Sequence, residues 1–308
     1  MPKFSVVRST LIDAPADRVF SALNDFHTWP HWSPWLIAEP NATVNIAEDG
    51  KSYNWEGKRV GSGAMSIASE TPGKSIDYDL TFLKPWKSQA KTSFLLTPAN
   101  DATKVSWTMD SSLPFFMFWM KNAMIAYIGN DYERGLALLK DYVENNGEVP
   151  SKLEFKGEEQ FAGYDYIGIK TQTTQAKLGA AMMKDFDRLN DYASTNAGNL
   201  AGQPMSIYHK WDIVRKNVVY TAALPVKEVP NPLPDGFTAG KIPTMRTYTM
   251  RHVGPYAHLG NAWATMMMMQ RNKEFKVVKG IHPFETYVNS PSDVTENELI
   301  TDIRFAIK

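Results

Sequence analysis

One carboxylate near the end of the chain has an aromatic setting. Glu285 lies in the segment Pro283-Phe-Glu-Thr-Tyr287, and Pro204-Met-Ser-Ile-Tyr208 repeats the same spacing of proline and tyrosine. Ser206 aligns with Glu285, so the acid has no counterpart in the sister segment. A carboxylate among aromatic rings attracts a cation, and cation–π contacts add to that attraction. A glutamate on a strand usually faces solvent. The residues alone therefore allow two places for Glu285, in a pocket or on the surface.

Further aromatic residues in the same half are candidates to share a site with Glu285. These aromatic residues occupy corresponding places in an internal repeat, and as a group they predict an aromatic-walled pocket. Each one taken alone is an ordinary core residue. A glutamate beside a tyrosine also has the groups for acid–base chemistry, with Glu285 and Tyr256 as the candidates. The candidate ligand-binding aromatics are Tyr208, Trp211, Tyr220, Tyr256, Trp263 and Tyr287.

The first half of the chain has no catalytic constellation, but it is rich in tryptophan. Its aromatic residues predict either the wall of a second apolar cavity or plain core packing. The apolar run Leu113–Gly129 is interrupted by Lys121 and Asn122, which disfavours a membrane span. We expect Leu113–Ile125 to cover the cavity or to form an interfacial patch. The candidate cavity residues are Trp35, Trp55, Tyr78, Phe82 and Trp107.

Composition excludes several classes of function. Lys and Arg number 33 and so do Asp and Glu, which argues against direct nucleic-acid binding because phosphate contacts need a basic excess. The absence of cysteine excludes thiolate metal sites and a cysteine nucleophile. Pro30 separates His27 from His31 and disfavours a helical pair of ligands, so we expect neither a metal nor a cofactor. The opening residues do not resemble a secretory signal, and we expect a cytoplasmic protein.

The length of 308 residues predicts two domains. The polar stretch Glu144–Ser151 reads as a linker, which gives domains at 1–147 and 152–308. In the first domain we expect a strand at Phe4–Ile12, a helix capped by Asp13, a meander of strands, and a long final helix with an apolar stripe from Ile128 to Val143. The predicted meander strands are Lys51–Trp55, Gly63–Glu70, Ser75–Leu83, Lys91–Thr97 and Lys104–Asp110.

The second domain is predicted to be a duplicated β-α-β-β unit. A Pro-rich turn without regular structure, Pro225–Pro243, separates the two copies. Joined about a pseudo-twofold, the copies would form one sheet with a groove where they meet. The first copy is predicted at Tyr164–Lys170, Thr174–Ala193, Met205–Trp211 and Asn217–Val226, and the second at Met245–His252, Tyr256–Arg271, Phe284–Asn289 and Glu298–Ile307.

The first domain resembles the SRPBCC, or START-like, superfamily in its polyketide-cyclase-type branch. The segments that carry the resemblance are VRSTLIDAPADRVFSALNDFHTWPHWSPW, YNWEGKRVGSGAMSI and IGNDYERGLALLKDYVE. The resemblance implies an α+β helix-grip fold, with an antiparallel sheet around the long C-terminal helix. It is a poor guide to function, since the superfamily includes carriers, receptors and enzymes.

The second domain resembles the GyrI-like effector-binding domain, through MRHVGPYAHLGNAW and HPFETYVNSP followed by ELITDIRFAI. That domain also senses ligands in multidrug-responsive transcription regulators, but this chain has the SRPBCC-like domain where those regulators carry a DNA-binding domain, so the resemblance does not support transcriptional control by this chain alone. The resemblance implies small-molecule binding and gives Glu285 the role of the pocket acid.

These observations predict a protein that binds small, mostly apolar molecules, cationic ones among them, through Glu285 and its aromatic neighbours. Two alternatives remain open from the sequence. One is a hydrolase or cyclase that uses Glu285 and a nearby tyrosine as acid and base on a reactive small molecule. The other is a module that binds and inhibits or escorts a protein partner. The sequence does not identify the ligand or the oligomeric state.

Overall fold

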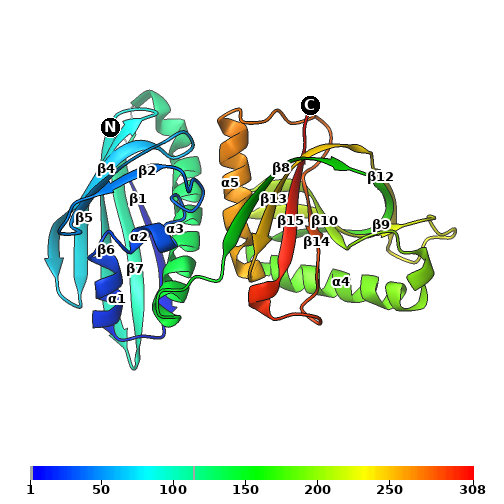
Figure 1. Ribbon diagram of the computed structural model, residues 1–308, viewed down its shortest axis with the longest axis horizontal. Coiled ribbons are helices and arrows are strands. Elements are labelled where there is room, and N and C mark those ends of the chain that lie inside the picture. Colours follow the sequence, from blue (N-terminus) through cyan, green and yellow to red (C-terminus); the bar gives the residue numbers. More distant parts are fainter. Residues whose placement is uncertain (1–2, 114) are drawn as a thin grey trace. The chain divides into compact units, whose positions relative to one another are not determined.

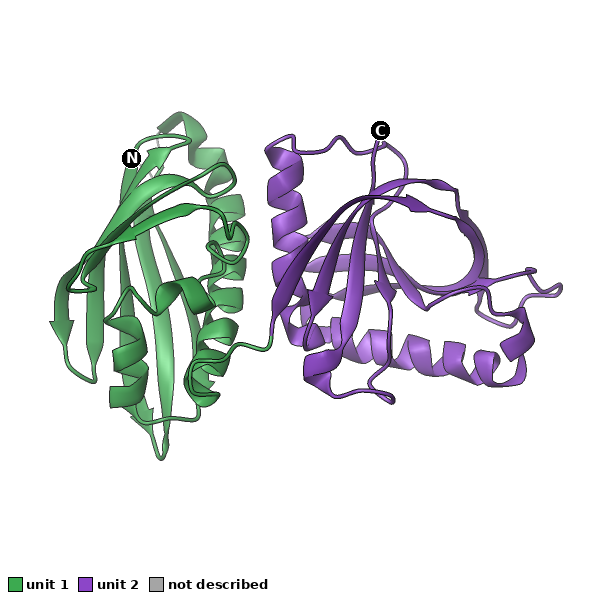
Figure 2. Cartoon of the chain, viewed as in Figure 1, with its two compact units in different colours: residues 1–150 green, residues 151–308 purple. Residues whose placement is uncertain are grey.

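The computed structural model describes residues 3–113 and 115–308, and the chain divides into two compact units at Pro150 and Ser151 (Figure 2). Within the described residues, the first unit contains a seven-stranded sheet and the second an eight-stranded sheet. All strand pairs in both sheets are antiparallel, and helices pack beside each sheet (Figure 1). The predicted α+β class is therefore confirmed.

The first unit is a meander that wraps along a long helix. Its strands follow the spatial order β1-β7-β6-β5-β4-β3-β2, so the first strand pairs with the last. The strands are β1 (Lys3–Ile12), β2 (Thr43–Ile46), β3 (Ser52–Gly57), β4 (Gly61–Thr71), β5 (Ser75–Lys84), β6 (Ser88–Ala99) and β7 (Ala102–Ser112). The helices are α1 (Ala16–Leu23), α2 (Trp29–Trp32), the 3-10 helix η1 (Phe115–Met120) and α3 (Lys121–Glu144).

Helix α3 packs against the sheet through the apolar stripe that the sequence predicts. Tyr132, Leu136 and Leu139 are buried in one core cluster together with residues of the strands. Gly135 permits the close approach, because a Cβ at this position would lie 2.7 Å from Cζ3 of Trp107. The spacing of these residues thus fixes which face of the helix meets the sheet.

The predicted helix cap at Asp13 is wrong. Helix α1 begins at Ala16, its N-cap is Pro15, and no side chain caps it. The backbone N–H of Asp13 instead donates to the carboxylate of Glu144, 2.6 Å away. Proline is tolerated at the start of a helix, so the chain turns into α1 two residues later than the cap would place it.

The second unit contains the predicted internal repeat. The first copy is β9-α4-β10-β11 and the second is β13-α5-β14-β15, and β10 pairs with β14 where the copies meet. The strands are β8 (Lys152–Phe161), β9 (Tyr164–Thr174), β10 (Met205–Asp212), β11 (Asn217–Val226), β12 (Thr238–Ile242), β13 (Met245–Val253), β14 (Phe284–Tyr287) and β15 (Ile300–Ala306). The helices are α4 (Leu178–Thr195) and α5 (Leu259–Arg271), with short 3-10 helices at Gln175–Lys177, Ala197–Asn199, Tyr256–His258 and Glu296–Glu298.

Two further strands link the copies crosswise. Strand β8 precedes the first copy but pairs with β13 of the second, and β12 precedes the second copy but pairs with β9 of the first. The expectation of irregular structure throughout Pro225–Pro243 is therefore wrong at β12. The sheet order is β12-β9-β11-β10-β14-β15-β13-β8, with the two unpredicted strands at its edges.

We predict that the two units fold independently, because each has hydrophobic core clusters made of its own residues. Limited proteolysis should cut the exposed turn at Asn145 and Asn146 or the residues that follow it, and leave two protected fragments. Mass spectrometry of the digest would identify the boundary. Rapid loss of both fragments after the first cut would contradict independent folding.

Candidate ligand-binding site around Glu285

The register between β10 and β14 places Glu285 at the centre of the second sheet. Ser206 lies directly opposite Glu285, so the two aligned residues of the repeat are neighbours across the junction of the two copies. Side chains alternate along a strand, and Tyr208 and Tyr287 therefore project from the same face as Ser206 and Glu285. Helix α5 contributes Trp263, whose indole ring lies 5.0 Å from the ring of Tyr208.

Three hydrogen bonds hold the Glu285 carboxylate. The indole N–H of Trp263 donates to Oε1 at 2.5 Å, and the hydroxyls of Tyr208 and Tyr287 donate to Oε2 at 3.0 and 2.8 Å. The Tyr287 hydroxyl also lies 2.9 Å from Oγ of Ser206. Glu285 is 2% exposed. The sequence allows this carboxylate to be either exposed or buried, and in the structure it is buried among aromatic side chains.

Burial and hydrogen bonding have opposite effects on the acidity of this group. Burial raises the pKa of Glu285 above its ordinary value of 4.5, while the bonds from Trp263, Tyr287 and Tyr208 lower it. Burial also raises the pKa of Tyr208 and of Tyr287 well above 10.0, and the negative charge of Glu285 raises both further. The two tyrosines therefore remain protonated donors at neutral pH.

Tyr256 lies at the solvent side of this cluster. It is 37% exposed, and its ring makes an edge contact with the ring of Tyr287 at 5.6 Å. Phe186 of α4 makes a similar contact with Tyr287 at 5.4 Å. Trp211 is also exposed and contacts Tyr208 at 5.7 Å. Trp263, Tyr208 and Tyr287 thus reach Glu285 directly, whereas Tyr256 and Trp211 reach it through another ring.

Tyr220 belongs to a neighbouring cluster with its own acid. Its hydroxyl donates to Oδ2 of Asp185 at 2.7 Å, and Thr171 donates to the same atom at 2.7 Å. Its ring lies 6.5 Å from that of Tyr208. Asp185 is buried, and it is not among the site residues predicted from the sequence. The signal was present, because Asp185 lies between Met182 and Leu189 on the apolar stripe of a predicted helix.

The predicted cavity residues of the first unit belong to its packed interior. Trp107 and Tyr78 are almost fully buried, and Trp107 stacks on Tyr132 with ring centroids 3.9 Å apart. Trp35 contacts Trp107 at 5.8 Å. Trp55 and Phe82 contact each other at 6.2 Å. That these rings line a ligand cavity remains a prediction.

The segment expected to cover that cavity has its aromatic side chains in solvent. Leu113 is buried, but the aromatic residues that follow are exposed. Pro114 lies outside the described residues. The exposed aromatic residues of this segment are Phe115, Phe116, Phe118 and Trp119.

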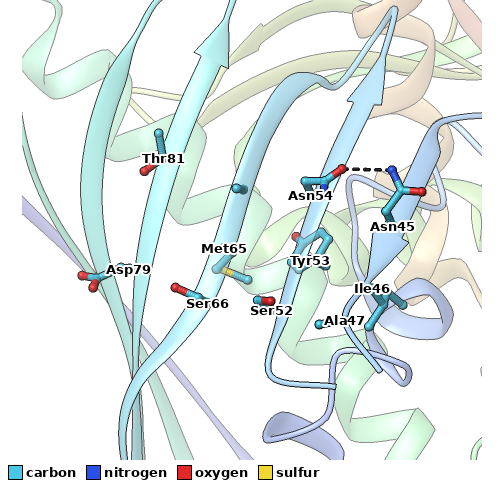
Figure 3. Close-up of a pocket in the computed structure, with 11 residues that line it drawn as sticks. Asn45, Ile46, Ala47, Ser52, Tyr53, Asn54, Met65, Ser66, Asp79 and Thr81 are labelled. Carbon is cyan, nitrogen blue, oxygen red and sulfur yellow. Dashed lines mark hydrogen bonds between the residues drawn. The ribbon is translucent and has the colours of Figure 1, made fainter. Parts of the chain in front are cut away.

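A pocket of about 430 Å³ lies over strands β2 to β5 of the first unit (Figure 3). Its lining combines polar side chains, among them Asn45, Asn54 and Asp79, with apolar ones such as Ile46 and Met65. The amide of Asn45 donates to Oδ1 of Asn54 at 3.0 Å across the strands. This lining differs from the aromatic cavity that the sequence predicts, and it shares none of the predicted residues.

The described residues offer no group of three or more His, Asp or Glu side chains suited to a metal ion. Among the helices of the described chain, none combines the length and the apolar character needed to cross a membrane.

Several solved structures are similar to parts of the chain. Protein MLL2253 from Mesorhizobium loti is 15% identical, covers 47% of this chain and 100% of its own, and has a TM-score of 0.37. CalU16 from Micromonospora echinospora is 18% identical over 46% of this chain and 77% of its own, with a TM-score of 0.33. The C-terminal domain of EcmrR is 17% identical over 51% of this chain and 98% of its own, with a TM-score of 0.41. A search of curated proteins finds no match.

Family models match both units. Residues 3–144 match the family described as polyketide cyclase / dehydrase and lipid transport, and residues 158–308 match the GyrI-like small molecule binding domain. Both resemblances inferred from the sequence are thereby confirmed. In chain order, a match to the polyketide cyclase / dehydrase and lipid transport family is thus followed by a match to the GyrI-like small molecule binding domain.

Proposed function

We propose that the second unit binds a small, largely apolar cation at Glu285. The observation that carries this proposal is a buried carboxylate whose hydrogen-bond partners are all uncharged. Trp263, Tyr208 and Tyr287 supply the three donors, and within the described part of the chain Glu285 forms no salt bridge. A buried negative charge without a positive partner is unfavourable, and a bound cation would supply that partner.

The surrounding rings support an apolar cation over a hydrated one. Tyr208, Trp263 and Tyr287 surround the carboxylate, and a cation close to their ring faces gains cation–π attraction. These rings also replace water poorly as hydrogen-bond partners, so a strongly hydrated ion would lose more solvation than it regains. Tyr256 is partly exposed beside Tyr287, which gives a ligand a side chain to displace on its way to the acid.

The proposal is tested by comparing two probes of the same shape. Benzyltrimethylammonium carries a permanent charge, and neopentylbenzene has carbon in place of its nitrogen. Calorimetry or ligand-observed NMR with the full chain should show that the cation binds at least about tenfold more tightly, as expected for a charge-assisted contact. Equal affinity for the two probes would contradict a cation site.

Acid–base catalysis is a second candidate function, and the raised pKa of Glu285 favours it. A carboxyl whose pKa is raised above its ordinary value, beside protonated tyrosines, is suited to give and take a proton in acid–base catalysis. Turnover of a reactive ester that disappears in Glu285→Gln, with binding of the ester retained, would support this function. Binding without turnover would favour the binding function alone.

A further inference from the structure

Four exposed aromatic side chains form a patch at one end of the first unit. Phe115, Phe116, Phe118 and Trp119 belong to η1, and we call them the aromatic end patch. Phe116 is 75% exposed and Trp119 is 71% exposed. Large apolar groups that gather on a surface in this way indicate an interaction site.

The patch is held in place by the opposite side of the same segment. Leu113 is buried in a cluster with Phe4 and Val6, and Met117 and Met124 pack against that cluster. The indole N–H of Trp119 donates to the backbone oxygen of Phe116 at 3.2 Å. The outward aromatics therefore do not compete for the core, because the methionines and Leu113 already fill the inward positions.

The sheet register brings a second exposed tryptophan to this end of the unit. Lys3 pairs with Ser112, so the start of β1 lies beside the end of β7 (Figure 1). Strand β6 begins at Ser88 and runs antiparallel to β7, which places the β5–β6 turn next to the residues after Ser112. Trp86 in that turn is half exposed. The loop between β3 and β4 ends at Gly61. Because the next residue, Ser62, pairs with Lys84 at the end of β5, this loop lies at the same end of the sheet.

Basic side chains outnumber acidic ones at the end of the first unit that carries the aromatic end patch. The basic residues of these turns and segment ends are Lys3, Lys58, Arg59, Lys84, Lys87 and Lys121. Three acids, Glu39, Glu56 and Asp110, lie at the same end. Glu56 pairs with Lys84 at 2.7 Å, and Glu39 accepts hydrogen bonds from the backbone N–H groups of the β3–β4 loop. Asp110 lies opposite Lys91 in the register. Lys3, Lys58 and Lys87 are exposed, and the net charge at this end is positive.

We propose that this end of the first unit docks on an anionic lipid surface. Phenylalanine and tryptophan side chains insert at the boundary between headgroups and acyl chains, and lysines beside them contact anionic headgroups. The aromatic residues and the lysines lie at the same end of one sheet, so both interactions occur together.

The experiment measures sedimentation of the full chain with vesicles. One vesicle contains phosphatidylcholine alone, and the other contains about one third phosphatidylserine. The unaltered protein should bind the anionic vesicles and leave them as salt rises, because screening weakens the charge contribution. The double variant Phe116→Ser/Trp119→Ser should lose about tenfold or more in bound fraction, since two apolar side chains no longer insert. Lys58→Glu/Lys87→Glu should lose binding to the anionic vesicles to a similar extent.

The matched control is Leu11→Ser/Leu95→Ser, which removes two exposed apolar side chains far along the strands from the patch. This control should bind like the unaltered protein, and unchanged thermal unfolding of every variant would show that the fold is intact. Three results would overturn the proposal: no vesicle binding, equal binding to both vesicle types, or an equal loss in the control. Self-association through the patch, seen by light scattering without vesicle binding, would assign the patch to a second copy of the chain instead.

Discussion

Replacing Glu285 with Gln should weaken binding of benzyltrimethylammonium by about 1–3 kcal/mol, or roughly 5- to 150-fold. The amide keeps the volume of the side chain, and its oxygen still accepts from the indole N–H of Trp263. The hydroxyls of Tyr208 and Tyr287 can rotate to accept from the new NH₂ group. The change therefore removes the negative charge with little effect on the shape of the cluster. Binding of neopentylbenzene should change much less.

Glu296→Gln is the matched control, because Glu296 is an exposed glutamate of the same unit. It removes the same charge from the surface and should leave cation affinity unchanged. Isothermal titration calorimetry on the three proteins gives the comparison directly. If Glu285→Gln binds the cation as tightly as the unaltered protein, Glu285 is not the polar determinant of this site.

The same carboxyl makes cation binding depend on pH. Only the ionised form attracts a cation, and burial raises the pKa of Glu285 above 4.5. Affinity should therefore fall as pH is lowered through this raised value, and Glu285→Gln should show no such fall. Stability of the empty protein should change in the opposite direction. The contribution of Glu285 is fully present below its unfolded pKa and is lost as pH rises through the folded one.

Replacing Trp107 with Ala should lower the free energy of unfolding of the first unit by about 3–5 kcal/mol. Trp107 is 2% exposed and stacks between Tyr132 at 3.9 Å and Phe94 at 4.7 Å. Its indole N–H donates to Oγ1 of Thr92 at 2.8 Å. Alanine would leave a large cavity and would remove a buried hydrogen bond as well.

Trp119→Ala provides the control, since this tryptophan is exposed and its loss should change stability by no more than about 0.5 kcal/mol. Differential scanning calorimetry of the full chain separates the two units if they unfold independently, and the transition of the second unit then serves as an internal reference. A loss of less than about 1 kcal/mol for Trp107→Ala would mean that the space around this ring is loosely filled. That result would favour a ligand cavity at Trp107.

The sequence predicts those parts of the fold in which apolar periodicity is strong. Helix α3 follows its stripe, and the repeated Pro-x-x-x-Tyr segments place Ser206 opposite Glu285 as neighbours in one sheet. Strand β8 is missed because its sequence, KLEFKGEEQF, is charged and interrupted by Gly157. An edge strand needs few apolar residues, so its pattern is weak. The short strand β12 is missed for a similar reason, since it contains Gly240 and adjoins a Pro-rich turn.

The sequence identifies Glu285 as the acid of the candidate site, but it does not predict which side chains contact this carboxylate. The alignment singles out Glu285, but which tyrosine donates to it depends on the distance between side chains of separate elements. Tyr220 has the same residue type as Tyr208, although its hydroxyl is bonded to Asp185. Only the packing of α4 against β9 and β11 separates these two roles. Outward orientation of Phe116 and Trp119 is likewise decided by the residues that occupy the core beneath them.

The crosswise pairing of β8 with β13 has a consequence for the synthesis of the chain. Lys152 pairs with Val253, so β8 leaves the ribosome about a hundred residues before its partner. At roughly 5–20 residues per second, this strand stays without a neighbour for about 5–20 s. An unpaired apolar edge would be open to aggregation during that interval. The alternating lysines and glutamates of β8, and the irregular register at Gly157, make this strand a poor template for another chain while it waits.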